Sequence, residues 1–118
     1  TDATIAAMEA LGASRSRIAA AVGPCIAQPS YEVDAAFRDR FLDGGADMAR
    51  FFAAGRPGHY QFDLPGYVGT RLESAGIARV ELLGLDTYPD EQRFFSFRRA
   101  THRGEADYGR QISLIGLV

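Results

Sequence analysis

Segments with the residue spacing of a β-strand alternate with segments with the spacing of an α-helix along this chain, and glycine or proline separates most of them. Such alternation is typical of the α/β and α+β classes. The chain has only 118 residues, and a parallel crossover takes a dozen or more, so few crossovers fit. We therefore expect an α+β (α/β layered) fold with a mixed β-sheet and flanking helices. Strand patterns fall at residues 18–22, 31–33, 59–63, 78–83 and 111–118, the last of them densely apolar.

The helix patterns begin at capping residues and end at glycines. The first one starts at once, with Thr1 or Thr4 as its cap and an apolar stripe of Ile5, Met8 and Leu11. Because it starts at a residue other than Met, we expect a piece of a longer polypeptide, with a processed natural terminus or a trimmed chain as alternatives. The other helices are expected after the cap Asp34, around Met48 and Phe51 to Phe52, and from Pro65 to Gly76.

Composition excludes several classes of protein. Hydrophobic residues make up 47% of the chain and charged residues 24%, so there is enough apolar surface to form a core. The net charge is −2, and no stretch approaches the roughly 20 apolar residues of a membrane helix, so we expect neither a nucleic-acid nor a membrane partner. One cysteine cannot form an internal disulfide, and no targeting segment is visible, which favours a reducing cytoplasm.

The turn Gly23-Pro24-Cys25-Ile26 ends the first strand pattern abruptly. Backbone N–H groups at such a turn suit an anion, and a thiol at a strand end suits a nucleophile. A small cysteine packed under a turn explains the same pattern, since free cysteine is often buried. A cysteine hydrolase built on Cys25 would need His59 or His102 as its base.

Residues 93–110 hold five of the thirteen arginines, interleaved with Phe94, Phe95, Phe97 and Tyr108. Guanidinium groups match phosphate oxygens and aromatic faces stack on bases, so this segment could bind a nucleotide or a phosphate. A solvated loop with its charges balanced by neighbouring carboxylates is the alternative.

Metal binding has little support within the chain. Cys25, His59 and His102 are the only soft ligands, and they lie far apart in the sequence. We therefore expect no metal ligand in this chain.

Five blocks, in order, resemble the C-terminal half of the laccase-domain family of multicopper polyphenol oxidoreductases. They are residues 20–26 with Tyr31-Glu32-Val33, Phe62-Asp63-Leu64, residues 83–88, Phe94-Phe95-Ser96-Phe97-Arg98-Arg99, and residues 108–113. Phe97 stands where the family usually has Tyr. The family's His-Cys-His metal ligands, one of them in a His-Ala-Gly-Trp-Arg-Gly motif, lie upstream of the matching region, so Cys25 does not inherit a ligand role.

The resemblance implies a four-layer α/β/β/α domain, of which residues 1–118 would be the C-terminal portion. Family members are zinc-dependent purine nucleoside phosphorylases with adenosine deaminase and methylthioadenosine phosphorylase activity. Their older description gives copper as the metal, and the current one gives zinc. Purine nucleosides and phosphate would be the ligands. Arg98, Arg99 and Arg110 are then candidates for phosphate or ribose contact, and Gly23, Pro24 and Cys25 would line the cleft.

The resemblance predicts an enzyme that is incomplete in this chain, and two further expectations remain open. Residues 93–110 could serve a non-enzymatic nucleotide- or phosphate-binding module, whose affinity would fall with salt and need no zinc. A half domain would also expose apolar surface, in parts of residues 18–22 or 112–118, so we expect a homodimer, a swapped assembly or a companion fragment.

Overall fold

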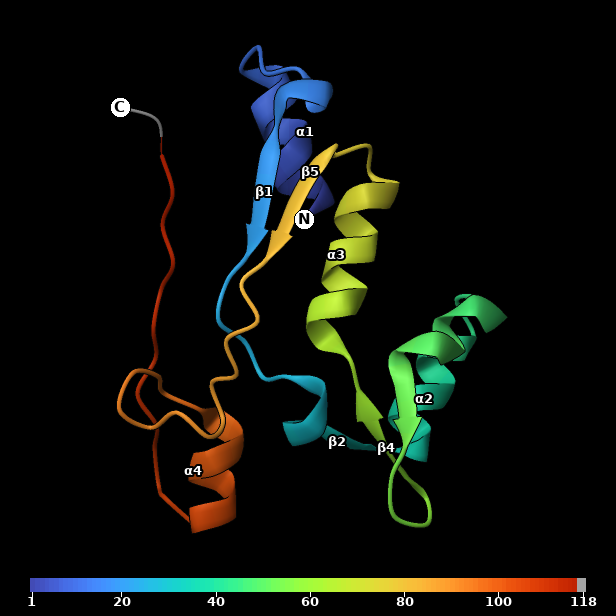
Figure 1. The fold of residues 1–118 in the computed structure, drawn as a ribbon, viewed down its shortest axis with the longest axis vertical. Helices are drawn as coiled ribbons and strands as arrows, with labels where there is room; N and C mark the ends of the chain where they lie inside the picture. Colours follow the sequence, from blue (N-terminus) through green and yellow to red (C-terminus); the bar gives the residue numbers. More distant parts are fainter. Residues whose placement is uncertain (117–118) are drawn as a thin grey trace.

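The computed structural model describes residues 1–116 and divides the strands between two sheets, joined by helix α3 (Leu64–Ser74) (Figure 1). The combination of helices with parallel and antiparallel strands is an α+β fold, as the sequence predicts, although the strands form two sheets and not one. The remaining helices are α1 (Asp2–Ala10), α2 (Ala35–Leu42) and α4 (Phe97–Arg103), with 3-10 turns at Arg15–Arg17, Gln28–Ser30 and Ala46–Phe51.

The first sheet consists of two parallel strands, β1 (Ala19–Val22) and β5 (Arg79–Leu82). They pair in register from Ala19 opposite Arg79 to Val22 opposite Leu82. A small core joins this sheet to α1 and α3 through three buried isoleucines, Ile5, Ile18 and Ile77. Helix α3 comes close to β5 at Gly69, where a Cβ atom would lie 3.1 Å from a methyl group of Leu82.

The second sheet is antiparallel, with the order β2 (Glu32–Asp34), β4 (His59–Phe62), β3 (Phe52–Ala54). Successive side chains of a strand face opposite sides, so Tyr60 and Phe62 share one face of β4. That face holds the main core, because Phe62 is only 1% exposed and its ring lies 4.8–5.9 Å from five other aromatic rings. Those five rings belong to Tyr31, Phe37, Phe41, Phe52 and Tyr67.

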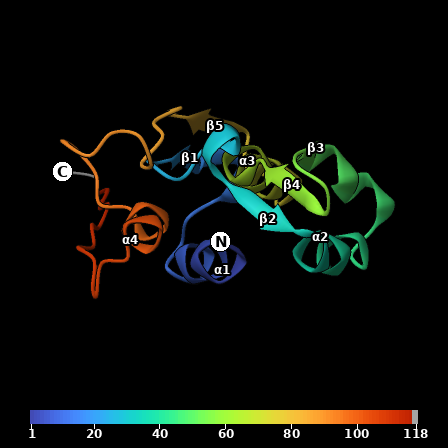
Figure 2. The same ribbon diagram turned by 90° about the horizontal axis from the view of Figure 1, so that it is seen from below.

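Aspartate side chains cap two helices, at Asp34 as predicted and at Asp63, which was not predicted, whereas the expected cap Thr1 forms no side-chain hydrogen bond. The Asp34 side chain accepts a hydrogen bond from the Phe37 amide at 2.7 Å, and this begins α2. Asp63 does the same for α3 by accepting from the Gly66 amide at 3.0 Å. Seen from below, α1, α2 and α4 lie along one side of the strands (Figure 2).

The terminal strand predicted over residues 111–118 is wrong for the described part, because residues 111–116 adopt no regular secondary structure. Ile112, Leu114 and Ile115 are 81%, 85% and 95% exposed, and the segment runs apart from both sheets (Figure 1). A strand is stabilised by pairing with a neighbour, and the apolar pattern alone does not supply one. Residues 117–118 of that prediction lie outside the described residues.

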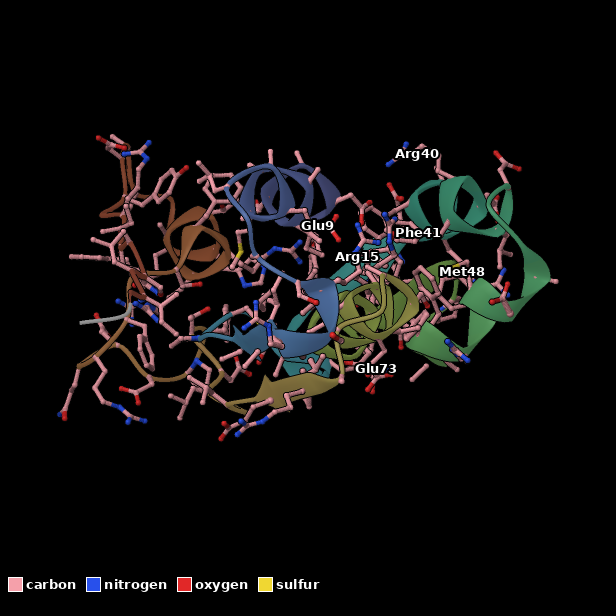
Figure 3. All side chains as sticks on the ribbon, turned by 90° about the horizontal axis from the view of Figure 1, so that it is seen from above. Glu9, Arg15, Arg40, Phe41, Met48 and Glu73 are labelled. Carbon is pink, nitrogen blue, oxygen red and sulfur yellow. The ribbon has the colours of Figure 1, made fainter. Side chains whose placement is uncertain are left out.

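Two elements depart from the sequence prediction in kind. The short helix predicted around Met48 is a 3-10 turn over Ala46–Phe51, and Phe52 already belongs to strand β3. Helix α4 was not predicted, because its seven residues include three arginines and no apolar stripe. In Figure 3, Phe41 and Met48 point toward α3. The apolar spacing in the sequence therefore correctly identified side chains that pack against the core.

The described chain is more open than a compact domain. Its radius of gyration is 16.2 Å, whereas about 13.5 Å is expected for a compact domain of this length. The accessible surface of 8086 Å² likewise exceeds the roughly 6,300 Å² typical of a folded monomer of this mass. The excess is about 1,800 Å², as large as many whole protein–protein interfaces. In residues 1–116, helices with the length and apolarity to cross a membrane are absent.

The aromatic core predicts a large effect at Phe62. Replacing Phe62 by Ala removes a buried ring and should lower the free energy of unfolding by about 3–5 kcal/mol. Urea denaturation followed by circular dichroism measures it. Ile115→Ala, at a side chain that is 95% exposed, is the control and should stay within about 0.5 kcal/mol of the parent. Equal losses in the two variants would contradict this placement of the core.

Candidate functional site

Residues 93–110 fold around helix α4. Ser96 is buried and its hydroxyl oxygen accepts a hydrogen bond from the Arg99 amide at 3.3 Å, which caps the helix. The segment before the helix is therefore anchored at Ser96, and its aromatic residues on either side are held in place.

Arg99 fixes the loop that precedes the helix. Its Nη1 donates to the carbonyl oxygens of Thr87 at 2.9 Å and Tyr88 at 2.7 Å, and its Nη2 donates to that of Phe94 at 2.6 Å. Hydrogen bonds from a charged donor are the strong ones, so this guanidinium orders residues 87–94. The structure thus gives Arg99 a backbone-ordering role beside the phosphate contact that the sequence predicts for it.

Three aromatic rings and one guanidinium form an exposed surface that we call the aromatic–arginine platform: Phe95, Phe97, Tyr108 and Arg110. Phe95 and Phe97 are 57% and 62% exposed. The rings of Phe97 and Tyr108 lie 4.9 Å apart, and the Arg110 guanidinium lies 4.2 Å from the Tyr108 ring centre. Exposed rings beside a cation can stack on a base and contact a phosphate.

Gly109 shapes the platform. A Cβ atom at this position would collide with the ring of Phe95, so a larger residue would displace that ring from its present position. Arg110 also donates to the Tyr108 carbonyl at 3.2 Å and lies 3.6 Å from Asp107. A hollow of about 260 Å³ adjoins the platform and is lined by Phe95, Arg99 and Tyr108, among others.

The turn after β1 continues the parallel pairing beyond the strands. The Cys25 amide donates to the Leu85 carbonyl at 3.2 Å, the Thr87 amide donates to the Cys25 carbonyl at 3.0 Å, and Cys25 bridges Asp86. This places the Gly23-Pro24-Cys25 turn next to the loop that Arg99 holds.

Asp86 orders both sides of this junction and was not singled out from the sequence. Its carboxylate accepts from the Ala27 amide at 3.2 Å, the Tyr88 amide at 2.9 Å and the Ser30 hydroxyl at 2.6 Å. Its position three residues after a predicted strand was the available signal, since Asp side chains in turns often bind nearby backbone groups.

Cys25 lies half-buried, and burial raises the pKa of its thiol, with the negative charges of Asp86 and Asp63 raising it further. A raised pKa disfavours the thiolate that a nucleophile needs. The two histidines are engaged elsewhere, His59 with Arg56 and the Pro57 carbonyl, and His102 with the Tyr88 hydroxyl at 2.9 Å. This geometry does not support the cysteine hydrolase hypothesis.

The six predicted site residues fall on separate surfaces. Gly23 and Pro24 line an apolar groove of about 650 Å³ between α1, β1, α3 and residues 113–115. Arg99 lines the hollow beside the platform, and Arg110 belongs to the platform itself. Arg98 lines a different cavity, next to β2, and Cys25 lies at the junction with Asp86.

The described residues do not fit a zinc or copper site. Within residues 1–116, groups of three or more His, Cys, Asp and Glu side chains placed to hold a metal ion are absent. These described residues thus do not supply the three protein ligands of a catalytic zinc.

The sequence profile of the family described as multi-copper polyphenol oxidoreductase laccase matches residues 1–118. The chain belongs to this family. A purine nucleoside phosphorylase of Rickettsia conorii is 38% identical over 87 residues, which cover 73% of this chain and 36% of the relative. One of Xylella fastidiosa is 36% identical over 97 residues, covering 80% of this chain and 37% of the relative.

Solved structures agree with the fold. A Neisseria meningitidis protein of the DUF152 family superposes with a TM-score of 0.69 at 24% identity, over 78% of this chain and 38% of that protein. A Bacillus licheniformis protein, YfiH, superposes with a TM-score of 0.74 at 24% identity, over 91% of this chain and 41% of that protein. The chain therefore spans well under half the length of the relatives and structures that it matches.

The raised pKa of Cys25 predicts slow alkylation. With iodoacetamide, the alkylation rate rises with pH as the thiol ionises. The midpoint of this rise should lie at a higher pH in the folded chain than in the same chain unfolded in urea, because the folded thiol has the higher pKa. Mass spectrometry reads the modification, and the chain has a single cysteine, so the site is unambiguous. A midpoint lower in the folded than in the unfolded chain would contradict the assignment and restore a thiolate nucleophile.

Proposed function

We propose that this chain is the C-terminal portion of a laccase-domain purine nucleoside phosphorylase and that it is active only together with the rest of that domain. The observation that carries the proposal is the aromatic–arginine platform, which lies in two of the blocks that resemble the family. The names of the relatives, at 36–38% identity, support the same chemistry.

In phosphorolysis, a phosphate oxygen bonds to the anomeric carbon of the sugar as the glycosidic C–N bond breaks. The purine leaves with the electron pair and takes up a proton, so the products are a free purine and a sugar 1-phosphate. Such a site must hold a flat base and a phosphate in line. Adenosine or inosine would be the substrate, and the family's adenosine deaminase and methylthioadenosine phosphorylase activities belong to the same proposal.

The residues of this chain would act by binding and orientation. Phe95 and Phe97, which are exposed, offer ring faces to the purine. Arg110, which already lies over Tyr108, would contact the phosphate or ribose, and Arg98 and Arg99 remain candidates for the same contact. The turn Gly23-Pro24-Cys25 would line the cleft of the completed domain. The family's zinc would be held by residues outside this chain.

The exposed apolar surface of the chain supports the proposal that another part of the domain covers it. The excess accessible area of about 1,800 Å² includes the exposed side chains of Ile112, Leu114 and Ile115. An apolar groove lies beside the free edge of β1. Large exposed apolar patches favour association, so the remainder of the domain, or a second copy of the chain, would cover them.

A nucleotide- or phosphate-binding module is the second candidate, and the exposure of Phe95 and Phe97 favours it. Such a module would bind without zinc and would not break the glycosidic bond. The experiment below separates it from the enzyme.

The test uses a chimera in which this chain replaces the matching part of the Rickettsia conorii phosphorylase. With inosine, phosphate and zinc, we expect the chimera to release free purine and the 118-residue chain alone to release none. In the chimera, Arg110→Ala should lower kcat/KM by about 10- to 100-fold, as expected for loss of a charge-assisted contact. Arg17→Ala, at an exposed arginine outside the platform, should leave kcat/KM unchanged.

A chimera that folds but does not turn over, together with nucleotide binding by the chain alone, would contradict the enzyme and favour the binding module. Zinc-dependent turnover by the chain alone would contradict the need for the rest of the domain. Equal losses in Arg110→Ala and Arg17→Ala would contradict the role of the platform.

A further inference from the structure

A second cavity lies at the free edge of β2, away from the platform. Strand β2 pairs with β4 on one side only, so its other edge is open. The cavity at this edge is open to solvent and has a volume of about 370 Å³. Its lining includes Tyr31, Glu32, Asp34, Arg40 and Arg98.

The two carboxylates of this cavity are already engaged. Glu32 forms hydrogen bonds with Arg56 at 3.0–3.1 Å, and this pairing holds the pKa of its carboxyl below the ordinary value. The carboxylate of Asp34 accepts from the Phe37 amide as the cap of α2. The Glu32 carboxylate is thus paired with a cation, and the Asp34 carboxylate is bound by a neutral amide.

Two arginines of the cavity keep most of their donors available. Arg98 donates through Nη1 to the Glu32 carbonyl at 2.7 Å, and its guanidinium lies 5.4 Å from the Tyr31 ring centre. That bond fixes the Arg98 side chain at the strand edge but uses only one of its five N–H groups. Among residues 1–116, its other N–H groups have no hydrogen-bond acceptor.

Arg40 is the second free cation. Its guanidinium lies 5.8 Å from the Phe37 ring centre, and within the described part of the chain it forms no ion pair. Figure 3 shows Arg40 pointing away from Phe41 and Met48, so α2 presents the cation outward while its other face packs in the core.

His59 adds a polar wall to the cavity. Because Arg56 can only donate, its Nη2 at 2.7 Å makes Nε2 of His59 an acceptor, and Nδ1 then donates to the Pro57 carbonyl at 3.1 Å. Both ring nitrogens of His59 are thus used within the chain. The lining of the cavity thus holds two guanidinium groups, of Arg40 and Arg98, and Arg56 pairs with Glu32 from outside this lining.

We propose that this cavity binds the phosphate group of a small phosphorylated molecule, held between Arg40 and Arg98. Guanidinium groups match phosphate oxygens in pairs, and a dianion gains more than a monoanion from two free cations. A phosphate group alone leaves most of the volume unfilled, so the cavity has room for the organic part of a phosphate ester. The site shares no residue with the platform, although its Arg98 is also a candidate phosphate contact in the proposed phosphorolysis.

The test is calorimetric titration of the 118-residue chain, at low salt, with glucose 6-phosphate, inorganic phosphate and acetate as separate probes. We expect saturable binding of glucose 6-phosphate and none of acetate. Arg40→Ala and Arg98→Ala should each weaken the affinity at least fivefold. Arg50→Ala, at an arginine that lies over Phe51 outside the cavity, should leave the affinity unchanged.

Arg40 is exposed, so Arg40→Ala tests the site without disturbing the core, and circular dichroism verifies its fold. Arg40→Lys, which keeps the charge but loses the paired donors, should fall between the parent and Arg40→Ala. Inorganic phosphate binding as tightly as the ester would support the site and identify free phosphate as its ligand. Acetate binding equal to that of the ester, or an affinity unchanged in Arg40→Ala, would overturn the proposal. Because binding is read directly, this outcome is independent of turnover by the chimera.

Discussion

The parallel pairing of β1 with β5 is the interaction on which the rest of this structure depends. It brings residues 19–22 beside residues 79–82, and the Cys25–Asp86 bridge extends the same pairing into the loops. Asp86 can then accept hydrogen bonds from the segments on both sides. The loop that follows places its carbonyl groups within reach of Arg99. The platform is therefore positioned by a sheet that lies some distance away from it.

A parallel sheet of two strands is itself incomplete in physical terms. Parallel strands are found in sheets covered on both faces, because their crossovers place helices there. Here each strand has a free edge, the radius of gyration is large, and apolar side chains of residues 112–115 face solvent. The antiparallel sheet differs, since its aromatic face is closed by α2 and α3 around Phe62. The parallel sheet thus lacks the cover that the antiparallel sheet has.

Local chemistry in the sequence predicted much of the fold. Asp34 caps α2 as expected, and the alternation of Tyr60 and Phe62 gave the buried face of β4. The prediction of a strand at residues 111–118 was wrong for the described residues, because apolar content reports a need for burial and not the presence of a partner strand. Helix α4 was missed because it lacks an apolar stripe and depends on the Ser96 cap and on Arg99. Arg99 binds the backbone carbonyl groups of Thr87 and Phe94, and the residue types do not announce these contacts. For the site, the arginine and aromatic types were visible in the sequence, but their division between Arg98 at β2, Arg99 at the loop and Arg110 on the platform was not.

Hydrogen exchange of the backbone amides of β1 and β5 tests the dependence on a covering partner most directly. It would be measured in the 118-residue chain alone and in the chimera with the Rickettsia conorii phosphorylase. The account predicts that amides of residues 19–22 and 79–82 exchange faster than those of β4 in the chain alone, and that they become protected in the chimera, where the free edges are covered. Equal protection of β1, β5 and β4 in the chain alone would contradict it, because the parallel sheet would then be stable without a partner.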